Sequence, residues 1–320
     1  MSAMYPQVIA HRGASGYLPE NTLAALELAH EQGVDWIECD VVLTKDNVAL
    51  VLHDVELDSV TDVAAKYPDR ARADGRYYAI DFTLEEIRSL RSRVRLNQDL
   101  SDVLYEGRFP TPPEPQPLVS LVDWIEAMQR LNRTAGREVG ICVELKGPVY
   151  HAKAGRDLPG KVAKILTKYG YNNTAARCLM MSFEPPVLQM MRREMDWQSP
   201  MLQLIGQPEW GESDYDYSRL LTPLGLEEVA QCATWIGTHL PQVITLEANQ
   251  PPRSTGLVEL AQNCGLRVAS FTFQHEGLPA GNSLPALLDY AIGPLGLDMP
   301  ICDFPDEGVA AVVRHRAGSA

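Results

Sequence analysis

Three acidic residues lie in apolar runs at positions that suit a metal ion. Glu38 and Asp40 are two positions apart in the run DWIECDVVL, and Glu144 lies in a later run, EVGICVEL. Residues two apart on a strand share a face, so Glu38 and Asp40 should point the same way. Carboxylates a few ångströms apart repel each other unless a cation lies between them. Three hard oxygen ligands, without cysteine or clustered histidine among them, favour Mg²⁺ or Ca²⁺ over zinc.

Two histidines lie close to these acids in the expected structure. His11 follows the first apolar run, QVIA, and His53 ends the run NVALVLH. A turn centred on Asp46 pairs positions that add up to 2 × 46 = 92, so residue 53 would lie opposite residue 39. His53 would then be level with the two acids of that strand. Two histidines beside carboxylates are the usual arrangement for acid and base catalysis near neutral pH.

A simpler arrangement of these charges is also open at this point. Arg12 directly follows His11, and Lys146 follows Glu144 by two positions, so the acids could form plain ion pairs with these two cations. The other histidines give weaker signals. His151 follows ELKGPVY and could line the same mouth, whereas the rest fall late in a helix, in loops or in the C-terminal tail (His30, His239, His275, His315).

Apolar runs of strand length alternate with helix-like stretches along most of the chain. The runs are mostly apolar on both faces, which is typical of parallel strands covered by helices. Eight such strands predict a (β/α)₈ barrel, or TIM barrel, in which the polar residues at the carboxyl ends of the strands form the active site. An open doubly wound sheet is the alternative. The predicted strands are residues 7–10, 35–43, 138–145, 177–183, 200–206, 234–237, 266–273 and 298–303.

One segment, residues 55–117, interrupts this alternation. It is polar and irregular, with one short helix signal in FTLEEIRSLRSR, where Thr83 and Glu86 could form a capping box. It closes with the Pro-rich connector FPTPPEPQP. We expect one barrel domain over residues 1–320 with this segment inserted after the second strand. Because it follows His53 directly, it should form a cap at the carboxyl ends of the strands.

Composition narrows the range of partners. The chain has 320 residues, 45% of them hydrophobic, and a formal net charge of −14. Such a charge repels nucleic acid and anionic lipid, and no apolar run is long enough for a membrane span. The first residues, MSAMYPQ, lack the features of a signal peptide, so we expect a cytoplasmic protein, or a periplasmic one if a signal peptide has been removed. Six scattered cysteines indicate buried thiols. Oligomeric state is left open.

Four stretches resemble the motifs of the glycerophosphodiester phosphodiesterase family, in that family's order and spacing. They are HRGASGYLPENTLAA, IECDVVLTKDNVALVLHD, VELK and CDFPD. HDVELDSVTDVA and ELKGPVYHAKAG further resemble the bacterial periplasmic-type branch, which also has an insertion after the His-Asp motif. The resemblance covers nearly the whole chain. Phe271-Thr272 departs from it, since the family usually has Trp-Thr there, and this concerns the pocket for the leaving group.

The resemblance implies a barrel that hydrolyses small glycerophosphodiesters, such as glycerophosphocholine or glycerophosphoethanolamine, to sn-glycerol 3-phosphate and an alcohol. One divalent cation, Ca²⁺ or Mg²⁺, would be held by the three carboxylates and would neutralise charge on the phosphate. Arg12 would bind phosphate oxygens as a fork and Lys146 as a point charge, with Phe271 in the substrate pocket. His11 and His53 would be acid and base, in either order. The attacking group would be water or the glycerol 2-hydroxyl.

Three other functions compete with this hypothesis. A phospholipid phosphodiesterase of the sphingomyelinase D or phosphatidylinositol phospholipase C kind would use similar chemistry, but it needs an apolar rim, against which the charge and the polar insertion argue. A non-catalytic barrel that binds glycerophosphodiesters should have lost a histidine or a metal carboxylate, and this chain has all of them. A structural barrel would use its acids only in ion pairs.

Overall fold

The computed structural model describes residues 5–109, 111 and 113–318. Eight parallel strands form a closed barrel, because β1 pairs with both β2 and β11. This closure confirms the (β/α)₈ prediction and excludes an open sheet. All eight predicted strands are present, in the barrel order β1 (Ile9–Ala10), β2 (Trp36–Leu43), β4 (Gly140–Leu145), β5 (Cys178–Ser182), β6 (Met201–Ile205), β7 (Trp235–His239), β10 (Arg267–Phe273) and β11 (Met299–Cys302).

Strand β3 (Ala49–Val51) runs back along β2 in the predicted register. Val41 pairs with Val51 and Leu43 with Ala49, so the paired positions add up to 41 + 51 = 92. The amide of Leu52 continues the ladder by donating to the carbonyl of Asp40 over 3.0 Å. The chain therefore reaches His53 beside the end of β2 that carries Asp40.

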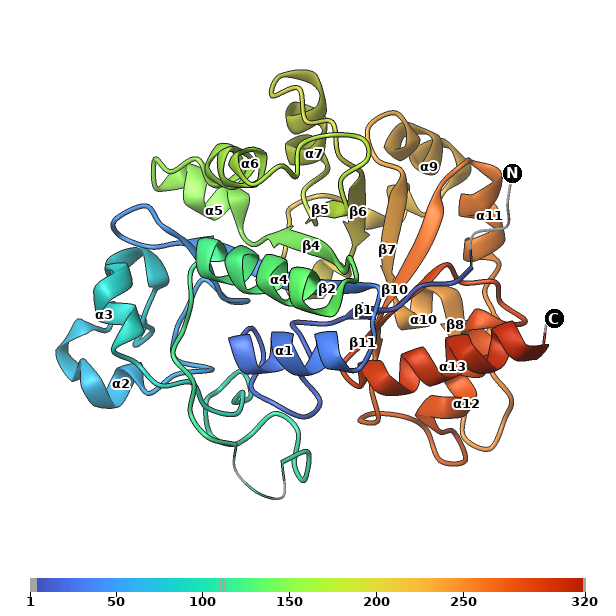
Figure 1. The fold of residues 1–320 in the computed structure, drawn as a ribbon, viewed down its shortest axis with the longest axis horizontal. Coiled ribbons are helices and arrows are strands. Elements are labelled where there is room, and N and C mark those ends of the chain that lie inside the picture. The colour runs from blue at the N-terminus through green and yellow to red at the C-terminus, as the bar shows by residue number, and fades with distance from the viewer. Residues whose placement is uncertain (1–4, 110, 112, 319–320) are drawn as a thin grey trace.

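Helices cover the outside of the barrel, and α1 and α4 lie side by side in Figure 1. Both helices begin at side-chain caps: Thr22 caps α1, and Ser120 and Asp123 form a capping box on α4. The helices around the barrel are α1 (Leu23–Glu31), α4 (Leu121–Ala135), α5 (Pro148–Lys153), α6 (Leu158–Lys168), α7 (Pro185–Arg193), α8 (Tyr217–Leu220), α9 (Pro223–Ala230), α10 (Leu240–Val243), α11 (Leu257–Asn263), α12 (Leu284–Ile292) and α13 (Pro305–Gly318), with a 3-10 turn at Pro208–Trp210.

Residues 55–117 leave the barrel between β3 and β4. Thr83 and Glu86 form the predicted capping box on α3 (Leu84–Arg88), but α2 (Val63–Lys66) and two 3-10 turns (Pro68–Arg70, Ala79–Asp81) had no clear signal. Figure 1 shows α2 and α3 to one side of the barrel. The segment has its own apolar cluster, built around Phe82, Ile87 and Leu57 and shared with the outer face of β2 and β3 through Val42 and Leu50. Its connector includes residues 110 and 112, which lie outside the described residues.

The end of this segment returns to the barrel. Arg95 contacts Glu20 after β1, Tyr105 contacts Gln274 after β10, and Arg108 contacts Asp303 after β11. Gln274 and Asp303 directly follow their strands, and Glu20 lies in the loop between β1 and α1.

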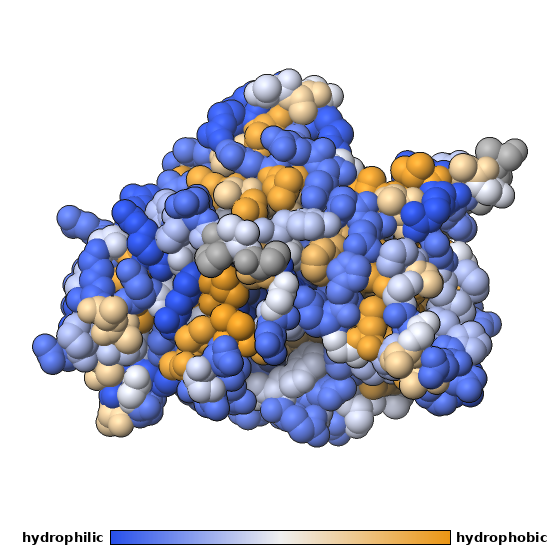
Figure 2. Space-filling model, turned by 90° about the horizontal axis from the view of Figure 1, so that it is seen from below, coloured by the Kyte–Doolittle hydropathy of each residue, from blue (hydrophilic) through white to orange (hydrophobic). Residues whose placement is uncertain are grey.

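A second, two-stranded hairpin, β8 (Ile244–Thr245) with β9 (Arg253–Ser254), lies between β7 and β10 and was not predicted. In the part of the chain that is described, no helix is long and apolar enough to cross a membrane. Figure 2 shows one face of the molecule, on which hydrophilic side chains predominate and apolar ones gather in patches beside a central hollow. Cys264 is half-buried and the other five cysteines are buried, all as free thiols, as predicted.

Candidate active site

The three predicted metal-binding carboxylates meet at one end of the barrel. Asp40 on β2 lies beside Glu144 on β4 in the sheet register, with Glu38 two positions earlier on the same face of β2. One oxygen from each of the three residues lies within 4.8 Å of the others, and all three are buried. Among the described residues, Glu38 Oε1 has no hydrogen-bond partner. A buried, unpartnered carboxylate oxygen facing two others fits a site for a hard divalent cation.

The pKa values of the three carboxylates also support a cation site. Burial, Asp40 and Glu144 raise the pKa of Glu38 well above its usual range. Burial, with Asp40 and Glu212, raises the pKa of Glu144 to about 8 although Lys146 opposes this. Burial also acts to raise the pKa of Asp40, but Arg12 outweighs it and the pKa is lowered. Without a cation, the protein's own charges therefore ionise only part of the cluster near neutral pH.

The predicted ion pairs are present, and they do not use up the acids. Arg12 Nε lies 3.2 Å from Asp40 Oδ2, and Lys146 Nζ lies 2.9 Å from Glu144 Oε1. Each cation also has a second acidic partner: Arg12 binds Glu20, and Lys146 binds Glu212 over 2.8 Å. The plain ion-pair arrangement therefore accounts for Asp40 and Glu144 in part. Within the described part of the chain, Glu38 forms no ion pair, although the charge of Arg12 acts on it from a greater distance.

The turn after β1 is built to bring Arg12 against the acids. Arg12 has a φ of 57°, in the left-handed region that non-glycine residues seldom adopt, and its amide N–H donates to Glu38 Oε2 over 2.7 Å. Gly13 follows with a φ of 80°, and a Cβ atom there would lie 2.6 Å from the carbonyl carbon of Ala25 in α1. Only glycine allows this close approach.

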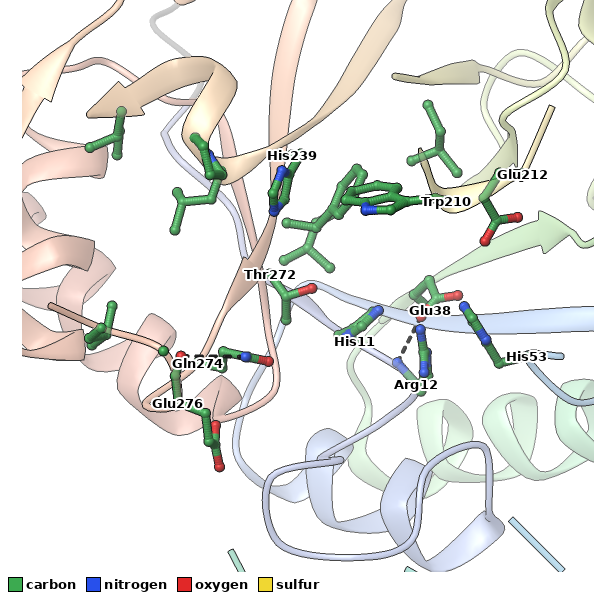
Figure 3. A pocket seen from close by; sticks show the side chains of 18 of the residues that line it. His11, Arg12, Glu38, His53, Trp210, Glu212, His239, Thr272, Gln274 and Glu276 are labelled. Carbon is green, nitrogen blue, oxygen red and sulfur yellow. Dashed lines mark hydrogen bonds between the residues drawn. The ribbon is translucent and has the colours of Figure 1, made fainter. Parts of the chain in front are cut away.

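His11 and His53 lie on either side of Glu38 and Arg12, as Figure 3 shows. Each ring is held through Nδ1 by an aspartate: His11 lies 2.7 Å from Asp303 Oδ1, and His53 lies 2.5 Å from Asp54 Oδ1. Burial, Arg12 and Lys146 lower the pKa of His53, so this imidazole is mainly neutral at pH 7.

These residues open onto a cavity of about 740 Å³. Its polar floor includes His11, His53, Arg12, Glu38 and Glu144, whereas Asp40 and Lys146 lie behind the lining. The predicted pocket residue Phe271 lies in an aromatic wall, with ring centroids 6.0 Å from Phe183 and 6.2 Å from Trp210. The size is that of a site for a small organic ligand.

Several residues of this cavity were missed by the sequence analysis. His239 is the last residue of β7, not a loop residue, and it lines the cavity beside Trp210. Asp303 directly follows β11, so the strand-end rule could have found it, as it lies in the CDFPD stretch. Glu212, Tyr105 and Glu276 lie in loops whose sequences gave no indication of a functional site.

Other residues were placed differently from expectation. His151 is not among the lining residues; it is buried in α5 and accepts a hydrogen bond from the amide of Leu43. His315 lies in α13 rather than in an irregular tail. His30 and His275 lie in a helix and a loop, as expected.

Comparisons with known proteins agree with this arrangement. The model of the Glycerophosphoryl diester phosphodiesterase family, whose members generally depend on divalent metal, matches residues 11–307. A glycerophosphodiester phosphodiesterase of Haemophilus influenzae is 34% identical over 94% of this chain and 88% of its own length. One of Treponema pallidum is 30% identical over 94% and 90%.

Solved structures share the fold. An Oleispira antarctica phosphodiesterase, in complex with the product sn-glycerol-3-phosphate, has a TM-score of 0.64 at 22% identity, over 97% of both chains. A glycerophosphodiester phosphodiesterase of Agrobacterium tumefaciens has a TM-score of 0.62 at 21% identity, over 95% of this chain and 99% of its own. With the family model and the two relatives covering almost all of the sequence, the chain belongs to the glycerophosphoryl diester phosphodiesterase family of enzymes.

Proposed function

We propose that this enzyme catalyses the metal-dependent hydrolysis of small glycerophosphodiesters, such as glycerophosphocholine or glycerophosphoethanolamine, to sn-glycerol 3-phosphate and an alcohol. The observation that carries the proposal is the pair of aspartate-held histidines on either side of a buried three-carboxylate cluster. Two proton-transfer groups and a cation site at one cavity floor are what the cleavage of a charged diester requires.

The cation in this proposal is one Ca²⁺ or Mg²⁺ ion, held by Glu38, Asp40 and Glu144. The unpartnered Glu38 oxygen and the raised pKa values of Glu38 and Glu144 support it, because both features are relieved by a nearby positive charge. When bound, a divalent cation neutralises the charge that develops on the phosphoryl oxygens and orients the glycerol hydroxyls.

The cationic side chains would hold the phosphate. Arg12 lines the cavity with its guanidinium fixed by Glu20 and Asp40, and its fork fits two phosphate oxygens. Lys146 lies behind it; burial acts to lower its pKa, but Glu144 and Glu212 raise it, so the amine stays charged. Together they draw an anionic group to the floor of a protein whose net charge is −14.

The histidines would move the protons. An ionised aspartate only accepts hydrogen bonds, so Nδ1 of each ring carries a hydrogen and Nε2 faces the substrate. Nε2 of the base is free to take a proton, and Nε2 of the acid carries the proton that it gives to the alcohol. The neutral state of His53 favours it as the base that activates water or the glycerol 2-hydroxyl. His11, across the cavity floor, would then protonate the departing alcohol. Attack by the 2-hydroxyl would first give a cyclic phosphate, which water would then open to sn-glycerol 3-phosphate.

The aromatic wall would receive the alcohol. Phe271, Trp210 and Phe183 surround one side of the cavity, and Glu212 and Glu276 also line it. Ring faces and carboxylates stabilise organic cations, which supports alcohols such as choline or ethanolamine as leaving groups.

The inserted segment, residues 55–117, would act as a cap over this site. Tyr105 lines the cavity, and Arg95 and Arg108 join the segment to residues beyond β1 and β11. A segment in this position limits the size of the substrate, and it supports membership of the branch that has an insertion after the His-Asp motif.

An apolar portion of the cavity favours one second candidate. Leu240, Ile244, Leu246 and Leu278 line it near the β8–β9 hairpin and could accept an acyl chain. A phospholipid-acting phosphodiesterase of the sphingomyelinase D or phosphatidylinositol phospholipase C kind would use such a surface. A non-catalytic glycerophosphodiester-binding barrel would have the same pocket but no turnover.

A substrate panel separates these three functions. Purified enzyme is given glycerophosphocholine, glycerophosphoethanolamine, lysophosphatidylcholine, sphingomyelin and phosphatidylinositol, each with Mg²⁺, with Ca²⁺ and with EDTA. We expect sn-glycerol 3-phosphate from the first two, abolished by EDTA. Preferential cleavage of the lipids would favour the second candidate. Binding of glycerophosphocholine without turnover under any metal condition would show a non-catalytic protein.

A further inference from the structure

Two hydrogen-bond chains, each a series of paired side chains, lead away from the two histidines. The residue types follow the same order in both. Behind His11, Asp303 Oδ2 lies 2.8 Å from Arg108 NH1, and Arg108 binds Glu276 through two bonds of 2.7 and 2.5 Å. The order is histidine, aspartate, arginine, glutamate. The first member lines the cavity, and the arginine side chain is only 4% exposed.

The second chain repeats this order behind His53. Asp54 Oδ2 lies 2.6 Å from Arg95 NH1, and Arg95 binds Glu20 through two bonds of 2.8 Å. Ser59 donates a further hydrogen bond to Asp54 Oδ2. Glu20 in turn holds Arg12, so this chain also ends at the proposed phosphate-binding residue.

Both arginines belong to the inserted segment, and neither lines the cavity. Arg95 lies between Glu20 and Asp54. Arg108 lies over the ring of Tyr105, with its guanidinium carbon 3.8 Å from the ring centroid. Carboxylates on two sides engage Nε, NH1 and NH2 of each guanidinium, and an aromatic ring covers one face of Arg108. Their surroundings therefore suit a role that is exerted through the aspartates.

The physical effect of each arginine is on the aspartate. Burial acts to raise the pKa of Asp303, but the His11 hydrogen bond and Arg108 lower it. Burial acts likewise on Asp54, and Arg95 and His53 bring its pKa well below the usual range. An arginine on the outer oxygen thus keeps each carboxylate ionised and fixes its rotation, which holds the imidazole in one orientation and one tautomer.

We propose that Arg95 and Arg108 are positioning residues for His53 and His11, so that the inserted segment completes the acid–base pair of the barrel as well as covering it. This inference rests on the proposed function of the two histidines. It assigns a separate arginine to each histidine, and the assignment can be tested one arginine at a time.

The test compares Arg108→Met and Arg95→Met with Arg76→Met as a matched control. Arg76 belongs to the same segment and pairs with the buried carboxylate of Asp58 over 2.7 Å. Its side chain bonds to Asp58 and to the carbonyl of Gln98, which belong to neither histidine chain, and it acts on Asp54 only as a more distant charge.

We expect kcat on glycerophosphocholine to fall about 10- to 100-fold in the first two variants, as is usual when the group that orients an active residue is removed. KM should stay within about twofold in Arg108→Met, because Arg108 does not line the cavity. In Arg95→Met, KM should also rise a few-fold, because Glu20, which holds Arg12, loses a partner. Arg76→Met should retain kcat.

A spectroscopic measurement makes the test independent of activity. In ¹⁵N-histidine NMR spectra, Nδ1 of both rings in the unmodified protein should carry a hydrogen, held by the aspartate. Arg108→Met should disturb the Nδ1 signal of His11 alone, and Arg95→Met that of His53 alone. The variants Arg108→Lys and Arg95→Lys, which keep the charge but lose the fork, should restore part of kcat and remain available if a Met variant does not fold.

Three results would overturn the inference: unchanged Nδ1 signals in both Met variants, a higher KM with unchanged kcat, or an equal loss in Arg76→Met. Inactivity of the unmodified enzyme on every glycerophosphodiester would instead refute the proposed function. The NMR comparison would still decide whether the arginines position the histidines.

Discussion

Glu144 Oε1 lies 2.9 Å from Lys146 Nζ, yet the pKa of Glu144 is raised to about 8, because burial and the neighbouring acids outweigh this one cation. If Glu144 is a metal ligand, as proposed, it is largely protonated at pH 7 and must release its proton when a divalent ion binds. The affinity of the proposed site for metal should therefore depend on pH.

The first prediction concerns this dependence. Protons and metal compete for Glu38 and Glu144, so affinity should rise with pH to at least about 8. Because the pKa values of Glu38 and Glu144 are both raised, one or two protons are released, and Kd should fall at least about tenfold per pH unit well below pH 8. Calorimetric titration with Ca²⁺ and Mg²⁺ from pH 5.5 to 9 measures this. A Kd that does not vary between pH 6 and 8 would contradict the raised pKa.

The second prediction concerns Glu38→Gln. The pKa of Glu38 is raised, so the metal-free protein favours its neutral form, and the neutral amide should cost little stability. The metal-free Tm should therefore stay equal or increase. At a metal concentration of 100 Kd, metal binding should raise the free energy of unfolding of the unmodified enzyme by about 2.7 kcal/mol. Glu38→Gln should lose this stabilisation.

Thermal unfolding with and without Mg²⁺ or Ca²⁺ checks this second prediction. The matched control is Glu212→Gln, which removes a carboxylate at the same mouth that is not part of the three-residue cluster. It should keep most of the metal response. Equal metal responses of Glu38→Gln and the unmodified protein would remove Glu38 from the ligand set.

The parts of the site that could be predicted from sequence depend on local geometry. The turn at Asp46 is short, so the pairing of Val41 with Val51 followed from counting positions, and with it the approach of His53 to Asp40. Glu38 and Asp40 share a face because strand geometry has a period of two. Caps such as Thr22 and Ser120 are also local signals.

The parts that could not be predicted depend on contacts between distant segments. His11 and Asp303 are 292 positions apart, and no periodicity links them. The pairing of Arg108 with Glu276 spans 168 positions and depends on how an irregular segment folds over the barrel. That segment appeared polar because its apolar residues are scattered, and they form a cluster only together with Val42 and Leu50 of the barrel.

The third prediction concerns Phe271→Ala. Phe271 packs between Phe183 and Trp210 in the proposed alcohol pocket, so removing its ring should weaken binding of the alcohol portion of the substrate. We expect kcat/KM on glycerophosphocholine to fall about tenfold, equivalent to ~1.4 kcal/mol. Metal affinity should not change. Kinetics on glycerophosphodiesters of several alcohols and one calorimetric metal titration measure both effects. An equal loss of kcat/KM for every alcohol, methanol included, would argue against a specificity role.

The fourth prediction concerns the two histidines. If they are one acid and one base, His11→Ala and His53→Ala should each lower kcat on glycerophosphocholine about 10²- to 10⁴-fold. Metal affinity should change much less, because neither histidine is among the three proposed ligands. The double variant should lose less than the product of the single losses, since groups that act as a unit are not additive. His275→Ala, in which a half-exposed histidine paired with Glu307 is removed, is the control and should keep its activity.

A substrate with a good leaving group then separates the acid from the base. A nitrophenolate departs without protonation, so the variant that lacks the acid should recover much of its activity on a nitrophenyl ester of glycerol phosphate. Because burial, Arg12 and Lys146 lower the pKa of His53 and leave it neutral, we assign the base to His53 and expect His11→Ala to recover. Recovery of His53→Ala instead would reverse the assignment. Near-normal turnover of both variants on glycerophosphocholine, or loss of metal in both, would refute paired acid–base catalysis altogether.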